Sequence, residues 1–500
     1  MAEVAEYGEL FIGGELVAPA GQDVIEVVSP HTEEVIGRVP HASRADVDRA
    51  VAVARKAFDQ GRGDWPRLPL EERLAVAERI RDGIAARADE IARVISSENG
   101  SPYSWSILAQ AYGPMMIWDA AIATAREFSF EEHRTGALGP ILVRREPVGV
   151  VAAVVPWNVP QFVAAAKLAP ALIAGCSVIL KPSPETPLDS YLLAEIVREA
   201  GLPEGVLSIL PADREVSEYL VGHEGVDKVS FTGSVPAGKR IMEVASRHLT
   251  RVTLELGGKS AAILLPDADL DEAVANLMSS AYMNNGQACV AQTRILAPRA
   301  QYDEIADRLV AAVGALAVGD PLAEATQVGP LVTRRQQQRN LDYIRIGQEE
   351  GAKVLTGGGV PAGLERGWYV EPTLLGGVDN RMRVAREEIF GPVVCLIPYD
   401  EETDALRIAN DSDYGLSGSV WCGDVEHGIE VARQVRTGTY SVNTFSLDFK
   451  GPFGGYKQSG IGREFGPEGL ASYLESKTVH LPAGYTPPAA GPAAAVGGEA

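Results

Sequence analysis

Apolar strands and amphipathic helices alternate along the middle of the chain. Short β-branched runs are expected to be strands at 148–155, 177–180, 206–210 and 228–231. Each is followed by a helical pattern, at 162–174, 188–200, 215–222 and 237–248. Apolar strands that alternate with helices are typical of a parallel sheet covered on both faces. The pattern therefore predicts an α/β fold built on a doubly wound parallel sheet.

The flanking regions carry other patterns. Short strands are expected in residues 7–40, and helices at 43–60, 69–87, 88–97 and 104–128, the last kinked at Pro114. Residues 129–146 are charged and less periodic, which suits an exposed ribbon. A second α/β block is expected after Gly257-Gly258. The Ala-, Pro- and Gly-rich tail at 486–500 is expected to be disordered.

One uncharged segment, residues 148–166, has the length of a membrane span. Pro156, Trp157, Asn158 and Pro160 lie in its middle, where a membrane helix would be continuous. A strand, a turn and a buried helix explain the segment better. We therefore interpret it as part of the parallel sheet.

Composition narrows the classes of function. The 67 acidic and 45 basic residues give a net charge of −22, which argues against nucleic-acid binding. The four cysteines are far apart and form no CxxC pair, so we expect free thiols and no zinc or other metal site. The acidic N-terminus lacks an apolar signal core, which predicts a cytoplasmic protein.

The stretch NNGQACVAQTRI, residues 284–295, holds the first candidate for chemistry. Most cysteines with apolar neighbours are structural and buried. Cys289 instead follows Gly286, Gln287 and Ala288, which suits a thiol that faces a cavity. Cys289 is therefore a candidate nucleophile.

Three further segments allow a functional or a structural interpretation. The turn with Gly233 and Gly238 follows a strand, as in a pyrophosphate site, but it is not a GxGxxG fingerprint and also suits an ordinary turn. Lys181 ends a strand, where it either enters a ligand crevice or lies in solvent. Glu255, between two leucines, is either a desolvated general base or an edge residue facing water.

Seven motifs in order resemble those of the aldehyde dehydrogenase superfamily, over residues 7–480. They are PWNVP (156–160), KPSPETP (181–187), FTGS (231–234), LELGGKS (254–260), NNGQACV (284–290), EEIFGP (387–392) and PFGGYKQSG (452–460). Each motif alone is weak, but their order is specific. The resemblance implies NAD(P)⁺-dependent oxidation of an aldehyde to a carboxylate.

The resemblance also implies catalytic roles. Cys289 would attack the carbonyl, and the Asn158 amide would hold the oxyanion with the Cys289 N–H. Glu255 would activate the water that hydrolyses the thioester. Glu464 matches a residue that some members use in a proton relay.

For the cofactor, NAD, the resemblance implies a set of contacts: Trp157, Lys181, Ser183, Gly233, Ser234, Leu256, Glu388 and Phe390. A glutamate that often follows the lysine by three residues, and accepts from the ribose hydroxyls, is replaced here by Pro184. We expect NAD⁺ to be preferred and NADP⁺ to be possible but weaker.

The implied substrate tunnel lacks lysine and arginine. Its residues would be Val159, Phe162, Val163, Ala166, Ala288, Val290, Phe445, Leu447 and Phe453. Val159 and Ala166 are small where many members carry aromatic residues, which predicts a wide tunnel. An apolar aldehyde is therefore expected, of medium to long chain, terpenoid or aromatic.

The family fold implies three parts. The nucleotide-binding domain, Rossmann-like, would be 1–128 with 147–257, the catalytic domain 258–458, and an oligomerisation ribbon 129–146 with 472–485. A homodimer or homotetramer is expected. Two rivals are a coenzyme-A-acylating dehydrogenase, against which Glu255 argues, and a non-catalytic protein, against which Cys289, Glu255, Asn158 and Lys181 argue together.

Overall fold

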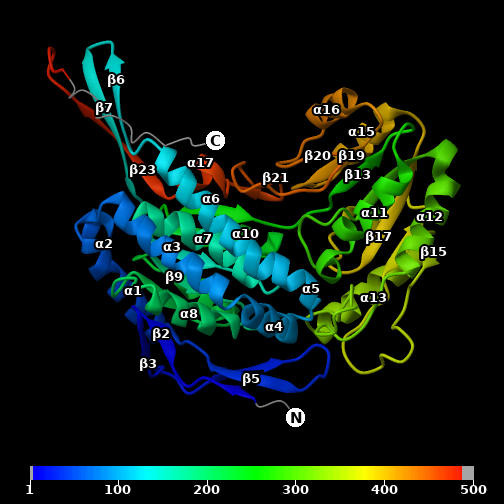
Figure 1. Ribbon diagram of the computed structural model, residues 1–500, viewed down its shortest axis with the longest axis horizontal. Helices are drawn as coiled ribbons and strands as arrows, with labels where there is room; N and C mark the ends of the chain where they lie inside the picture. The colour runs from blue at the N-terminus through cyan, green and yellow to red at the C-terminus, as the bar shows by residue number, and fades with distance from the viewer. Residues whose placement is uncertain (1–3, 487–500) are drawn as a thin grey trace, which may run out of the picture.

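The computed structural model describes residues 4–486 and shows two α/β units joined side by side, with a long ribbon projecting from one of them (Figure 1). The α/β class predicted from the alternating pattern is confirmed. The expected disorder of the C-terminal tail concerns residues that, from 487 on, lie outside this description. No described helix has the length and apolar character needed to cross a membrane.

The first unit contains an eight-stranded sheet with a parallel centre. Its order is β22 (Gly460–Ile461), β12 (Arg251–Glu255), β11 (Lys228–Thr232), β8 (Val150–Val154), β9 (Ser177–Lys181), β10 (Leu207–Ile209), β2 (Leu10–Ile12) and β3 (Glu15–Val17). The five strands from β12 to β10 are mutually parallel, and the others pair antiparallel at the two edges.

Helices cover both faces of this sheet. Along β8, Val150, Ala152 and Val154 pack under one layer, whereas Val151 and Ala153 pack under the other. The first layer is α1 (Arg44–Phe58), α9 (Arg214–Val221) and α10 (Val235–Ala245). The second is α3 (Leu70–Ala86), α4 (Ala88–Asn99), α6 (Gly113–Glu127), α7 (Pro160–Ala174) and α8 (Asp189–Glu199). Burial on both faces explains why these strands are continuously apolar.

The predicted helix at 104–128 is interrupted. It consists of α5 (Tyr103–Ser106), a π-helical stretch, η2 (Ile107–Tyr112), and α6. Pro114 lacks an N–H and would clash with the carbonyl four residues before it in a regular helix. The wider π turn ahead of Pro114 accommodates it, and such turns often lie at functional sites.

The second unit contains a seven-stranded sheet. Its order is β15 (Lys353–Thr356), β16 (Thr373–Gly376), β17 (Val393–Tyr399), β14 (Arg294–Pro298), β13 (Ala261–Leu264), β19 (Gly418–Trp421) and β20 (Ser441–Val442), and only β15 runs antiparallel. One face packs on α11 (Leu270–Ala281) and α12 (Tyr302–Gly314). The other packs on α13 (Arg334–Glu349), α14 (Arg383–Arg386), α15 (Glu402–Asn410) and α16 (Val425–Gln434).

The projecting ribbon is a three-stranded antiparallel sheet, with β7 (Gly139–Pro147) between β6 (Glu131–Gly136) and β23 (Leu474–His480). β23 follows α17 (Gly466–Ala471). The chain therefore returns from the second unit to the first unit before it enters the ribbon (Figure 1). A small N-terminal sheet is formed by β1 (Ala5–Glu6), β5 (Val35–Pro40) and β4 (Val24–Val28).

Candidate active site

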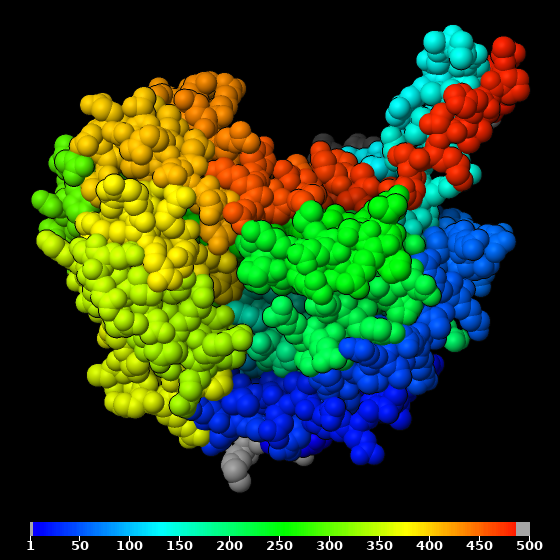
Figure 2. All heavy atoms as spheres, turned by 180° about the vertical axis from the view of Figure 1, so that it is seen from behind, coloured from blue at the N-terminus to red at the C-terminus, as the bar shows by residue number. Residues whose placement is uncertain are grey.

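A cavity of about 890 Å³ lies between the two units and holds most of the predicted site. The surface is hollowed where the two units meet (Figure 2). Three neighbouring parallel strands end there: Trp157 and Asn158 follow β8, Gly233 follows β11, and Glu255 ends β12. A doubly wound sheet binds ligands at the carboxyl ends of its strands.

Cys289 enters this cavity on an irregular loop after the short helix η3 (Met283–Gly286). Asn284 and Asn285 have φ of 49° and 59°, a left-handed conformation that asparagine tolerates better than most residues. Gly286 passes so close to the Gly391 carbonyl that a Cβ would lie 2.1 Å from its oxygen. Only glycine fits there, and this contact anchors the loop to the second unit.

Side-chain amides behind the loop hold Asn158 in place. Asn284 Nδ2 donates to the Asn158 carbonyl at 2.9 Å and to the Gln287 carbonyl at 3.2 Å. Asn99 Nδ2 donates to the same Asn158 carbonyl at 3.2 Å. Asn158 Nδ2 donates to the Gln287 carbonyl at 2.8 Å, which uses one of its two hydrogens. The Asn158 amide is therefore fixed beside the Cys289 loop with one donor hydrogen to spare.

The Cys289 thiol lies in an environment that disfavours the thiolate. Burial, followed by the negative charges of Glu388 and Glu255, raises its pKa to about 12. The thiol is therefore protonated at neutral pH, and a base has to accept its proton before it can act as a nucleophile.

Glu255, in the same cavity, has the properties of such a base. Its side chain is buried, and among the described residues neither carboxylate oxygen has a hydrogen-bond partner. Burial and the nearby Glu464 carboxylate raise its pKa well above the usual value, against the opposing effects of the Lys167 and Arg463 charges and of the nearby Gly455 backbone N–H. A carboxyl group with a raised pKa accepts protons near neutral pH, which suits general base catalysis.

Glu464 lines the same cavity, but its carboxylate already forms an ion pair. Its Oε1 accepts from Lys167 Nζ at 2.6 Å, and both side chains are buried. Lys167 also donates to Ser230 Oγ at 3.3 Å, to which the Tyr473 hydroxyl donates at 3.1 Å. A polar chain thus runs from the cavity wall into the first unit.

One end of the cavity suits a dinucleotide. The Trp157 and Phe390 rings meet edge to face, 5.3 Å apart. Glu388 Oε1 accepts from the Gly258 N–H at 2.8 Å, and burial raises the pKa of this carboxyl to about 7. Gly233, Ser234 and Leu256 line the same end, and Ser234 begins α10 without a side-chain cap on its N–H groups. Lys181 and Ser183 lie outside the cavity lining, at the end of β9.

The other end is apolar. Predicted tunnel residues that line it are Val159, Phe162, Val163, Ala288, Val290, Phe445, Leu447 and Phe453. Sequence reasoning missed Trp105 and Ala109 from α5 and η2, together with Met283 and Phe465. The Phe465 ring packs 6.1 Å from Phe162 and 5.8 Å from Phe453. Only Phe465 had a local signal, since it adjoins Glu464.

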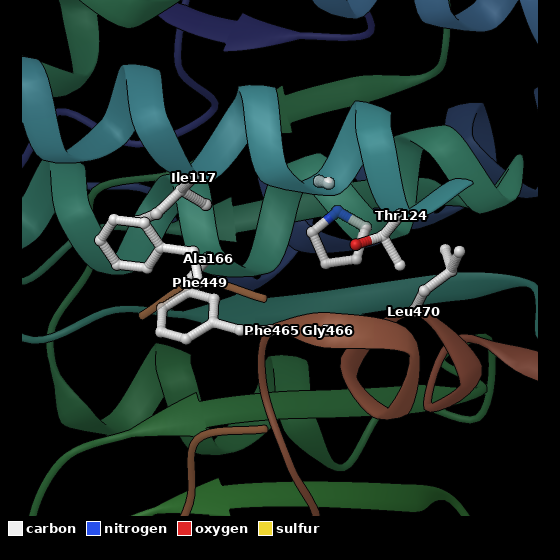
Figure 3. A pocket seen from close by; sticks show the side chains of 9 residues that line it. Ile117, Thr124, Ala166, Phe449, Phe465, Gly466 and Leu470 are labelled. Atoms are coloured by element: carbon white, nitrogen blue, oxygen red, sulfur yellow. The ribbon is translucent and has the colours of Figure 1, made fainter. Parts of the chain in front are cut away.

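Ala166 does not line the main cavity, contrary to the expectation that it widens the tunnel. It lies in a second, much smaller apolar cleft between α6, α7 and α17, with Ile117 and Leu470 (Figure 3). Phe465 lines both spaces and forms a wall that they share. The helical position of Ala166 therefore directs its methyl group behind this wall.

Comparisons with known proteins agree with this geometry. Geranial dehydrogenase of Castellaniella defragrans is 45% identical over 95% of this chain and 99% of its own length. A 3-succinoylsemialdehyde-pyridine dehydrogenase of a Pseudomonas species is 43% identical over 95% and 98%. The structure of a Mycobacterium tuberculosis aldehyde dehydrogenase complexed with NAD⁺ superimposes with a TM-score of 0.95, at 49% identity over 97% of this chain and 100% of that one.

A mutant of aldehyde dehydrogenase C from Pseudomonas syringae, in complex with NAD⁺ and octanal, superimposes with a TM-score of 0.92, at 40% identity over 96% and 98% of the two chains. The sequence model of the aldehyde dehydrogenase family matches residues 16–479. With the motifs, the fold and the cavity in agreement, the chain belongs to the aldehyde dehydrogenase family.

Proposed function

We propose that the protein oxidises an apolar aldehyde to its carboxylate with NAD⁺, through a thioester on Cys289. The observation that carries this proposal is the meeting of Cys289, Glu255 and Asn158 in one cavity with an apolar wall. A nucleophile, a base and an amide donor are the groups that aldehyde oxidation through a covalent intermediate requires.

In the first step, Cys289 attacks the carbonyl carbon after its thiol proton has moved to Glu255. The developing oxyanion accepts from the free Asn158 Nδ2 hydrogen and from the Cys289 N–H. Because Asn284 and Asn99 already hold the Asn158 backbone, this donor needs no rearrangement when the charge forms. Loss of a hydride from the adduct leaves the thioester.

The residues present fit a dinucleotide. The uncapped N–H groups at the start of α10 face the cavity and suit a pyrophosphate. Trp157, Leu256, Glu388 and Phe390 would hold the nicotinamide end, and Lys181 and Ser183 the adenosine end. When bound, the nicotinamide supplies the acceptor for the hydride. Two of the similar structures named above contain NAD⁺.

Before the second step, Glu255 releases the thiol proton toward solvent, which restores its carboxylate. Glu255 then takes a proton from water, which attacks the thioester; the carboxylate product leaves and the Cys289 sulfur is set free. A base is needed because a neutral water is a poor nucleophile. Glu255 lines the cavity, and no residue in the described range 4–486 hydrogen-bonds to its carboxylate, so this group is free to hold that water. Glu464 and Lys167 would pass the proton onward.

The composition of the cavity wall supports an apolar substrate. Among its described lining residues the only cations are Arg335 and Arg339, and Arg339 donates to the carbonyls of Glu388 and Ile389 at the cofactor end. Away from these two arginines, a second carboxylate on the substrate would stay unpaired. An aldehyde of medium to long chain, terpenoid or aromatic, therefore fits better. Relatives named for geranial and bound to octanal support this class.

We further propose a homodimer or homotetramer in the cytoplasm. The ribbon of β6, β7 and β23 leaves an edge strand outside the body of the protein, and Leu138 at its tip is almost fully exposed. An exposed edge with an apolar tip is suited to pairing with another subunit.

The test is spectrophotometric NAD⁺ reduction with a series from acetaldehyde to decanal, geranial, benzaldehyde and succinic semialdehyde. Each methylene that enters the apolar end should contribute about 0.8 kcal/mol to kcat/KM. Cys289→Ala should abolish turnover, whereas Cys422→Ala, far from the cavity, should not. A preference for acetaldehyde or succinic semialdehyde would overturn the substrate class, and turnover without Cys289 would overturn the mechanism.

A further inference from the structure

Lys181, at the end of β9, is a buried cation at the expected adenosine end of the cofactor site. Its side chain is 7% exposed, and among the described residues no carboxylate forms an ion pair with its Nζ. With Pro184 in place of a glutamate, this lysine would favour the 2′-phosphate of NADP⁺. The surrounding charges decide whether it does.

Two carboxylates adjoin this lysine from different segments. Glu185 follows in the same turn, and the Ser183 hydroxyl donates to its Oε2. Asp213 comes from the neighbouring strand: β10 runs parallel to β9, and the Leu210 N–H donates to the Leu180 carbonyl at 2.9 Å. Both strands therefore end at the same edge, with Asp213 only three residues beyond Leu210.

Asp213 has a free oxygen for a ligand. Its Oδ1 accepts from the Val216 N–H at 3.0 Å as the N-cap of α9, and no described residue donates to its Oδ2. The side chain is 54% exposed. An acidic residue just beyond a strand of a dinucleotide-binding sheet is the group that accepts from ribose hydroxyls.

The electrostatic balance around Lys181 agrees with this placement. Burial lowers the pKa of Lys181 to about 8, and the negative charges of Glu185 and then Asp213 act in the opposite direction. A 2′-phosphate placed against Lys181 would therefore lie within the field of two carboxylates. It would be repelled by both.

The other basic groups near Asp213 already lie beside carboxylates of the protein. Arg214 lies one turn before Glu218 on α9 and helps to lower the pKa of that carboxyl, after the larger effect of Arg240. His41 Nε2 accepts from the Asp213 N–H at 3.1 Å and lies 3.5 Å from Asp213 Oδ1, so Asp213 itself already engages this nitrogen. Neither offers the bidentate grip that a phosphate site favours.

We propose that Asp213 and Glu185 replace the missing glutamate: together they accept the adenosine ribose hydroxyls and exclude a 2′-phosphate. This inference rests on the proposed dinucleotide site. It makes the enzyme selective for NAD⁺ although Pro184 stands at the usual position of the acceptor.

The test measures equilibrium binding of NAD⁺ and NADP⁺ to the intact enzyme by calorimetry, for the parent, Asp213→Asn, Glu185→Gln and the double variant. Asparagine caps a helix as well as aspartate, so α9 is preserved. Asp213→Asn should tighten NADP⁺ binding tenfold or more and weaken NAD⁺ binding severalfold. The double variant should show larger changes in both affinities. The matched control is Glu215→Gln, a neighbouring carboxylate that is exposed and paired with Arg44.

The outcomes separate this inference from the proposed function. A parent that binds NAD⁺ at least tenfold more tightly than NADP⁺, with the ratio collapsing in the double variant, supports it. The inference is overturned if the parent binds NAD⁺ but neither substitution changes the ratio of NAD⁺ to NADP⁺ affinity. It is also overturned if Glu215→Gln changes that ratio equally. Both results leave the proposed function standing. A parent that binds neither dinucleotide overturns both.

Discussion

Two buried glutamates share the wall of the active-site cavity and differ in their partners. Glu255 is 3% exposed and Glu464 is 5% exposed. Glu464 forms an ion pair with Lys167, with Oε1 and Nζ 2.6 Å apart. Among the described residues, neither oxygen of Glu255 has a hydrogen-bond partner. The two carboxyl groups thus have similar burial, but only that of Glu464 is paired with a cation among the described residues.

This difference separates a carboxylate that is paired with a cation from one that has no such partner among the described residues. A buried charge that keeps its partner is tolerated, and the loss of either member leaves an uncompensated charge. A buried carboxyl group without a partner is unfavourable for the fold, and its pKa rises because the charged form is poorly solvated. Glu255 is therefore suited to exchange protons, whereas Glu464 is held in place by its buried ion pair with Lys167.

The largest effect is expected from Glu255→Gln, which keeps the shape but removes the base. Turnover should fall by a factor of about 10² to 10⁴, and no rapid burst of NADH should appear, because the Cys289 thiol loses its base as well. Thermal stability should be unchanged or higher, because a desolvated acid is lost. Rapid mixing and a melting curve measure both. Glu349→Gln, on the surface, is the control; steady turnover at the parent rate would assign the base elsewhere.

Lys167→Met tests the other side of the comparison. Removal of one member of a buried pair costs about 3–5 kcal/mol, so the urea midpoint should fall markedly. Arg345→Met breaks the exposed pair with Glu349, 2.8 Å apart, and should cost less than about 1 kcal/mol. Equal midpoints for the two variants would show that the buried pair has no special structural role.

The pH dependence of kcat links the two glutamates. Because the ionised form of Glu255 is the base, kcat should rise with pH through its raised pKa. The Glu464 charge contributes to that rise, second to burial. Glu464→Gln should therefore lower the pKa of Glu255 and extend activity to lower pH. If the acid limb of the pH profile of kcat is the same in Glu464→Gln as in the parent, the two groups do not interact.

Tyr473→Phe should have the smallest effect. It removes only the 3.1 Å hydrogen bond from the tyrosine hydroxyl to Ser230 Oγ, at a cost of about 0.5–1.5 kcal/mol. Stability should fall slightly, while kcat and its pH profile stay as in the parent. A displaced pH profile would extend the functional network beyond Lys167.

The secondary structure around the site was largely predictable, because apolar periodicity reports burial locally. The strands expected at 177–180 and 228–231 correspond to β9 and β11 within one residue. The helix expected at 104–128 was only partly correct, since the pattern cannot distinguish an α turn from the π turn that Pro114 imposes. The tunnel role of Ala166 failed because helical spacing alone does not locate the Phe465 wall.

The sequence by itself determined the α/β class and the candidate nucleophile, base and amide, because their motifs are short and continuous. Only the tertiary structure decided which buried glutamate has a partner, since Lys167 and Glu464 are 297 residues apart. It also brought the amide of Asn284 to the Asn158 carbonyl, across 126 residues. Local periodicity fixes how each segment folds, but the packing of two sheets determines which polar groups are buried, and burial is the main reason that the pKa of Glu255 is raised.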